Sequence, residues 1–194
     1  MGDKLAPMPD TRTPFAGPSA SARKSRPPLY TPQERARRDG TYWTFVQGIL
    51  APIQFLVFLG SLGFVLRYLA TGEGLETANN SVIAKTLVLY TIMITGCIWE
   101  KVVFGRYLFA PAFFWEDVFS MLVLALHTAY LAALSQGWLS SRELMYLALT
   151  AYATYAINAG QFILKLRAAR LDHEEKLRKA SAAPQGADMG AACA

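Results

Sequence analysis

Three carboxylic acids and a histidine stand in an otherwise apolar stretch near the middle of the chain. These residues are Glu100, Glu116, Asp117 and His127. Carboxyl groups in different protonation states act as general acid and general base, and a histidine can do the same or bind a metal ion. Because each such group costs free energy in an apolar environment, this stretch is a candidate site for proton-transfer chemistry.

The spacing of these residues predicts that they lie together. His127 follows Glu116 by about three helical turns, or about 16 Å along the axis, so both share one face of a helix, with Ser120 and Val123 or Leu124 between them. Glu100 ends the preceding apolar segment, and a short connection leads from it to Glu116. Two antiparallel helices joined in this way bring their ends together, so the three carboxyl groups should converge inside a wall of aromatic residues: Trp99, Phe104, Tyr107, Phe109, Phe113, Phe114 and Trp115.

The elements that position these residues are predicted to be membrane helices. The chain is 53% hydrophobic and only 17% charged, and its apolar residues form long blocks instead of amphipathic stripes. A helix of about 20 apolar residues crosses the hydrocarbon core. Strand-like alternation is absent, so we expect an all-α polytopic membrane protein, a bundle of four transmembrane helices at about 45–69, 81–103, 112–134 and 144–166.

The basic residues predict the orientation of this bundle. Most of the 19 lysines and arginines lie before the first segment, between the second and third, or from Lys165 onward. By the positive-inside rule both termini and the connection around Glu100 and Asp117 face the cytoplasm. Arg67, Lys85 and Arg142 are placed beside the two remaining loops.

The chain divides into a membrane domain and two tails. Residues 1–30 are rich in Pro, Ser, Ala and Arg and are expected to form a disordered cytoplasmic tail. The membrane domain covers 31–180, and 181–194 are expected to form a flexible tail. At the start of the domain, the sequence TPQE predicts a short basic helix on the membrane surface, with Thr31 as its cap and Glu34 completing a capping box.

Other classes of function find little support. There is no Gly-rich phosphate loop, no Ser-His-Asp set and no metal-ligand spacing of cysteines. The net charge of +5 is explained by the membrane topology. We therefore expect the lipid bilayer as a partner and no nucleic acid.

Structural explanations of the same residues remain open. Glu116 and Asp117 stand in the first turn of a helix, where negative charge is favoured by the helix dipole. The tryptophans and tyrosines are also typical of an interfacial aromatic belt. His127 can be a neutral histidine bonded across helices, and polar side chains of the last segment such as Asn158 can be contacts between helices.

A resemblance to a known family is found at these residues. The run WEKVVFGRYLFAPAFFWEDVFSMLVLALHTAYL, together with VQGILAPIQFLVFLGSLGFVLRYLATGEG and AYATYAINAGQFILKLRAARL, resembles the 3-vinyl bacteriochlorophyllide hydratase family of photosynthetic bacteria. The resemblance covers roughly Leu29 to Leu171. It implies addition of water to the vinyl substituent on ring A of a magnesium chlorin, giving a 1-hydroxyethyl group on the route to bacteriochlorophyll a. The substrate carries its own magnesium, so no cofactor is required. The resemblance also implies a location in the bacterial inner (intracytoplasmic) membrane, and it suggests other enzymes of bacteriochlorophyll biosynthesis as partners.

The chemistry of hydration suggests a role for each residue. Glu100, Glu116 and Asp117 supply an acid, a base and a negative charge near the developing cation. His127 would complete the catalytic set as a ligand of the substrate magnesium or by orienting the ring. The expected substrate-binding residues are Trp99, Phe113, Trp115, Tyr130 and Asn158. A non-catalytic membrane protein that binds or carries bacteriochlorophyll precursors is the alternative, and the oligomeric state is left open.

Overall fold

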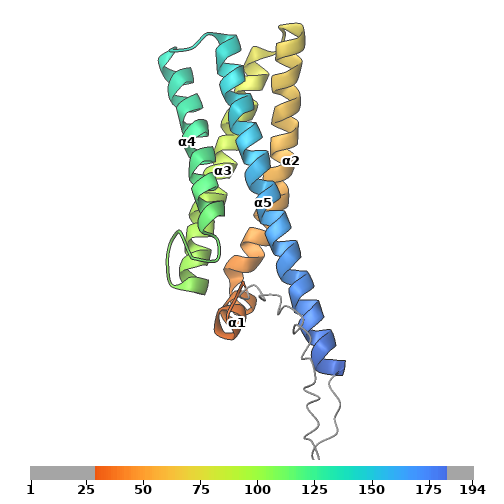
Figure 1. Ribbon diagram of the computed structural model, residues 1–194. Helices are drawn as coiled ribbons and strands as arrows, with labels where there is room; N and C mark the ends of the chain where they lie inside the picture. The colour runs from red at the N-terminus through yellow and green to blue at the C-terminus, as the bar shows by residue number, and fades with distance from the viewer. Residues whose placement is uncertain (1–28, 183–194) are drawn as a thin grey trace, which may run out of the picture.

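The protein folds into five helices. The computed structural model describes residues 29–182, so the predicted tails at 1–30 and 181–194 lie almost entirely outside the described residues. Within that range there is no strand, which confirms the prediction of an all-α protein. The helices are α1 (Pro32–Gly40), α2 (Tyr42–Thr71), α3 (Leu75–Phe104), α4 (Phe114–Gln136) and α5 (Ser141–Ala182) (Figure 1).

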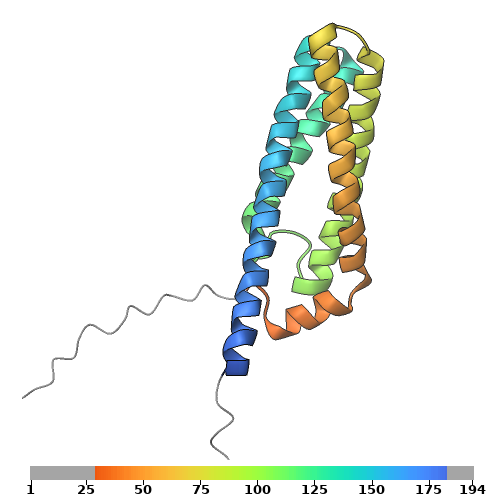
Figure 2. The same ribbon diagram turned by 90° about the vertical axis from the view of Figure 1, so that its right-hand side faces the viewer.

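Helices α2 to α5 form an up-and-down bundle of two hairpins. α2 packs along α3 and α4 packs along α5, and the hairpins meet through α2 with α5 and α3 with α4. In Figure 2, the lower parts of α5 and α2 lie on opposite sides of the bundle, and the α3–α4 connection lies between them. All four helices contribute side chains to the buried apolar core. These side chains include Phe58, Val65, Val82, Val123, Tyr130, Met145 and Tyr152.

Three of the helices are long and apolar enough to cross a membrane. Among the described residues these are α2, α3 and α4. Large apolar side chains on the outside of the bundle, as a lipid environment requires, include Leu56, Leu66, Ile94, Leu122 and Ile157. α5 is not among the three, because polar residues such as Thr150, Thr154 and Asn158 interrupt its apolar part. The fourth membrane span therefore stays a prediction.

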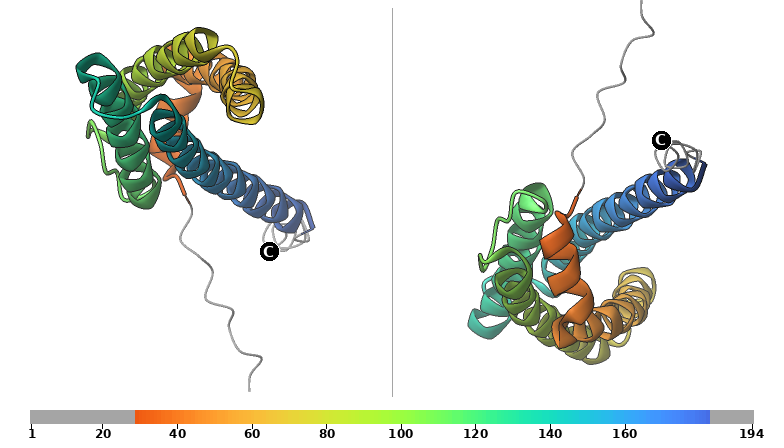
Figure 3. Two further views of the ribbon diagram at one scale, coloured as in Figure 1. Left: turned by 90° about the horizontal axis from the view of Figure 1, so that it is seen from above. Right: turned by 90° about the horizontal axis from the view of Figure 1, so that it is seen from below.

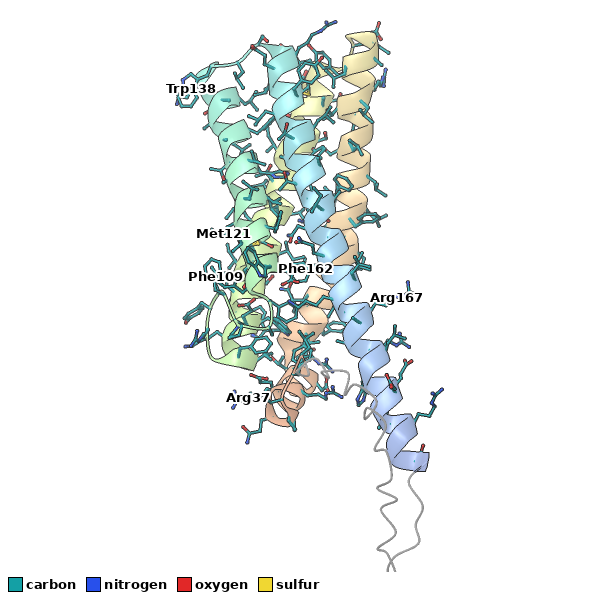
Figure 4. All side chains as sticks on the ribbon, in the orientation of Figure 1. Arg37, Phe109, Met121, Trp138, Phe162 and Arg167 are labelled. Atoms are coloured by element: carbon teal, nitrogen blue, oxygen red, sulfur yellow. The ribbon has the colours of Figure 1, made fainter. Side chains whose placement is uncertain are left out.

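The first helix begins as its sequence predicts. Thr31 Oγ1 accepts a hydrogen bond from the Glu34 N–H at 3.3 Å, and the Glu34 carboxylate accepts from the Thr31 N–H at 2.8 Å. This reciprocal capping box confirms the predicted start of the domain at TPQE. Figure 3 shows α1 lying across the lower end of the bundle. Its Arg37 side chain, labelled in Figure 4, donates to the carbonyl of Val103 in α3 at 3.4 Å.

The connection between α3 and α4 folds back against the bundle. Gly105 ends α3 in the left-handed region, with φ of 79°, where a residue without Cβ is favoured. Phe109 also has a positive φ, 58°. Tyr30, which precedes α1, packs against Phe104 and Phe113 at the two ends of this connection. The lower ends of α3 and α4 are thereby held together directly above α1.

Candidate active site

Two carboxyl groups meet where α3 ends and α4 begins. Glu100 stands one turn before the end of α3 and Asp117 stands in the first turn of α4, and they are only 6% and 5% exposed. The N–H of Phe109 donates to Asp117 Oδ2 at 2.8 Å. The Glu100 carboxyl interacts with that of Asp117 and with the backbone N–H of Ala110. Its Oε2 atom has no hydrogen-bond partner among the described residues.

This contact between two buried carboxyl groups has a chemical consequence. Two adjacent negative charges repel strongly where little solvent screens them, so the pair is most stable when the two groups share one proton. Such a pair can release a proton from one member and accept a proton on the other. The structure thus brings Glu100 and Asp117 close enough to share a proton.

The third carboxylate, Glu116, has a different partner. Its Oε2 lies 2.6 Å from Nζ of Lys165 on α5, and the two side chains are 9% and 28% exposed. Lys165 also lies over the ring of Phe113, with Nζ 4.9 Å from the ring centroid. From the sequence, Lys165 counted only among the basic residues that set the orientation, and this ion pair was not predicted. Its helical spacing from Asn158, about two turns, is the signal that could have found it.

The aromatic wall contains only part of the predicted set. Phe113 is 2% exposed, and its ring centroid lies 5.8 Å from that of Trp99 and 5.9 Å from that of Phe104. Phe162, labelled in Figure 4, adds a ring from α5 stacked on Phe113 at 5.8 Å. The Trp99 indole N–H donates to Thr44 Oγ1 at 2.9 Å.

The rest of the predicted wall points outward. Trp115 is 67% exposed, since it lies two positions, about 200° around the helix, from the buried Asp117. The structure thus places Trp115 outside the buried aromatic cluster, and its role in substrate binding stays a prediction. The other members of the predicted wall that are exposed are Tyr107, Phe109 and Phe114.

His127 lies on the same buried face of α4 as Glu116, as its spacing predicts. The side chain is fully buried, and Nδ1 is 2.8 Å from the carbonyl oxygen of Val123. A carbonyl oxygen only accepts, so Nδ1 carries the hydrogen and the neutral ring presents a bare lone pair on Nε2. Nε2 has no partner among the described residues. This is the form of histidine that ligates a metal ion.

Lys85 lies close to His127 inside the bundle, and its position was not predicted correctly from the sequence. The expectation that it lies beside a loop is wrong: α3 begins at Leu75, so Lys85 stands about three turns inside the helix, with no exposed surface. Its Nζ lies 3.9 Å from the ring centroid of Tyr155 and has no hydrogen-bond partner among the described residues. It is close enough to His127 to interact with it electrostatically. A lysine inside an apolar segment was the available signal.

Further polar groups lie inside the bundle. Asn158 on α5 donates through Nδ2 to Ser120 Oγ at 2.8 Å, while its Oδ1 has no partner in the described part of the chain. The hydroxyl of Tyr130 donates to Asn79 Oδ1 at 2.8 Å, so this predicted substrate-binding group is already engaged. Buried polar atoms without partners mark places where water or a ligand binds. The remaining ones are Gln54 Oε1 and Gln161 Oε1.

Comparison with known proteins identifies the family. The profile of the 2-vinyl bacteriochlorophyllide hydratase family (BCHF) matches residues 30–168. The chain is 69% identical over 146 residues to the 2-vinyl bacteriochlorophyllide hydratase of Cereibacter sphaeroides, covering 75% of this chain and 91% of the relative. It is 65% identical over 154 residues to the protein of the same name from Rhodobacter capsulatus, covering 79% of this chain and 90% of the relative. No solved structure matches the chain.

The chain belongs to the 2-vinyl bacteriochlorophyllide hydratase family. The resemblance predicted from the sequence is thereby confirmed, since 2-vinyl and 3-vinyl denote the same substituent in two numbering schemes. The part of the chain that matches the hydratase family includes the Glu100 and Asp117 pair, the ion pair of Glu116 with Lys165, and the buried residues Lys85 and His127.

Proposed function

We propose that this membrane protein adds water to the vinyl substituent on ring A of a bacteriochlorophyllide, and that it does so at the Glu100 and Asp117 pair. The product carries a 1-hydroxyethyl group and belongs to bacteriochlorophyll biosynthesis. Relatives of 65–69% identity that bear the name of this hydratase support the reaction. The buried contact between the two carboxyl groups is the observation that carries the proposed mechanism.

The reaction needs one proton to be given and one to be taken. The protonated member of the pair transfers its proton to the terminal vinyl carbon, and the positive charge develops on the carbon attached to the ring. The conjugated macrocycle spreads this charge, and the two carboxylates stabilise it. The oxygen of water then bonds to that carbon, and its excess proton passes to a carboxylate. The pair ends with one proton, as it began.

The surroundings of the pair have supporting roles. Glu116 Oε2 lies 2.6 Å from Nζ of Lys165, and this ion pair places a further carboxylate near the developing cation. Trp99 and Phe113 would pack against the macrocycle and exclude all but the reacting water. This arrangement explains why a hydratase keeps ionisable groups inside an apolar helix bundle.

The macrocycle would lie lengthwise inside the bundle, with its vinyl edge towards the carboxyl pair. The bare Nε2 of His127 is suited to ligate the magnesium that the substrate carries, and the unpartnered Oδ1 of Asn158 lies on α5 between these levels. Tyr130 would contribute its ring at the far end. No cofactor is needed, because neither proton transfer nor water attack changes an oxidation state.

We further propose the membrane arrangement that this mechanism uses. α5 crosses the bilayer together with α2, α3 and α4, and both termini lie in the cytoplasm, with the bundle in the bacterial inner membrane. The carboxyl pair then lies near the cytoplasmic side of the bundle, next to α1 and its basic residues Arg37 and Arg38. Other enzymes of bacteriochlorophyll biosynthesis could deliver and receive the pigment from that side.

Labelled water tests the proposed reaction directly. Membranes containing the protein are incubated with 3-vinyl bacteriochlorophyllide in water enriched in heavy oxygen, and the pigments are separated and weighed. Membranes from cells lacking the protein are the control. We expect a hydroxyethyl product that carries one labelled oxygen. Pigment that copurifies with the protein but is never hydrated would contradict the proposal and favour a carrier.

A further inference from the structure

Lys85 is the one lysine of the described bundle that is wholly shielded from solvent. Its exposed area is zero, whereas Lys165 is partly exposed and Lys101 is exposed. Its Nζ lies over the face of the Tyr155 ring and has no hydrogen-bond acceptor within residues 29–182. The proposed chemistry at Glu100 and Asp117 makes no use of it.

An ammonium in this position calls for an anionic partner. A cation and π contact replaces only part of the hydration that a buried ammonium loses. Ionisable groups inside a membrane bundle pair with an opposite charge or face a functional cavity. Within residues 29–182, Nζ of Lys85 has no hydrogen-bond partner, so no carboxylate in that range is bonded to it. The missing partner is therefore expected on a ligand.

The ligand of the proposed function carries such a group. A chlorophyllide has a free propionate side chain, whereas the corresponding chlorophyll has an ester in its place. We propose that Lys85 binds the propionate carboxylate of the pigment and so selects the free acid over the ester. This inference rests on the proposed function, which supplies the pigment as ligand.

The positions of Lys85 and Glu100 along α3 agree with this assignment. Lys85 and Glu100 are separated by about 22 Å along α3, and both are buried on the inner side of that helix. A single pigment can serve both only if it lies lengthwise in the bundle, with the vinyl edge at one end and the propionate arm at the other. His127 stands near Lys85, where its free Nε2 faces the same ligand.

The assignment predicts how esterification of the propionate affects binding. An ester bond removes the negative charge and leaves the Lys85 ammonium unpaired, so the esterified pigment should bind poorly.

The test compares two pigments and three proteins. Binding of 3-vinyl bacteriochlorophyllide and of its methyl ester to the purified protein is measured by fluorescence titration in detergent micelles, and KM and kcat are measured for both. The variant is Lys85→Met, which removes a buried charge at similar volume and so should not unfold the bundle. The matched control is Lys101→Met, an exposed lysine on the same helix.

We expect the parent and Lys101→Met to bind the free acid about tenfold to a hundredfold more tightly than the ester, as for a hydrogen bond to a charged group. Lys85→Met should lose this preference while binding the ester as the parent does, with the change in KM and not in kcat. Equal binding of acid and ester by the parent, or an equal loss for both pigments in Lys85→Met, would overturn the assignment. If neither pigment is hydrated but the acid preference depends on Lys85, the proposed function fails and the assignment stands.

Discussion

Removal of the Lys165 ammonium should destabilise the bundle by leaving Glu116 without its ionic partner. The Glu116 side chain is only 9% exposed, and its Oε2 lies 2.6 Å from Nζ of Lys165. Loss of one member of a buried pair costs about 3 to 5 kcal/mol. We expect about 3 kcal/mol for Lys165→Met, at the low end of that range, because water reaches part of the lysine and screens the pair. For a chain of this size this lowers Tm by about 6 to 12 °C.

The assay is thermal unfolding of the purified protein in detergent micelles, followed by loss of helical circular dichroism. The double variant Lys165→Met with Glu116→Gln removes the unpaired charge and should recover most of the lost stability, so the two changes should not add. Lys101→Met, at an exposed position, is the control for loss of a lysine and should leave Tm nearly unchanged. A Lys165→Met protein as stable as the parent, or fully additive single and double variants, would refute the ion pair as a structural contact.

Three further substitutions test the connections around the site. Gly105→Ala places a Cβ in the left-handed region at φ of 79°, so it should cost about 1 to 2 kcal/mol and reduce turnover by displacing the α3–α4 connection; unchanged Tm and turnover would count against this. Thr31→Ala removes the capping box and should cost α1 about 1 kcal/mol, seen as faster amide hydrogen exchange there and not in α3; uniform exchange rates would argue otherwise. Asn158→Ala leaves Ser120 without its donor and should weaken pigment binding in a fluorescence titration, while affinity equal to that of the parent would exclude Asn158 from the binding site.

Local patterns in the sequence were sufficient where the chain itself decides the structure. The capping box at Thr31 and Glu34 depends on residues three positions apart, and it formed as predicted. The shared face of Glu116 and His127 depends only on helical periodicity, and both are buried. The three most apolar helices follow from composition alone.

The choice of the inward face could not be predicted with the same success. In a membrane bundle both the lipid face and the core face are apolar, so hydropathy does not mark which side of a helix is buried. Trp115 was expected beside the carboxyl groups but turned outward, while Phe162 from α5 turned inward. Lys85 and Lys165 were counted only as signs of orientation, because their partners are brought close by packing of distant segments.

Turnover by Glu100→Gln and Asp117→Asn tests the central claim most directly. Each substitution keeps the size of the side chain but removes the group that gives or takes the proton. The control is Glu76→Gln, an exposed position on the same helix as Glu100. Hydration of 3-vinyl bacteriochlorophyllide should fall by about a hundredfold or more in both variants, as for loss of a general acid or base, and should be unchanged in the control. Hydration near the parent rate in either variant, with its folding intact, would contradict the account.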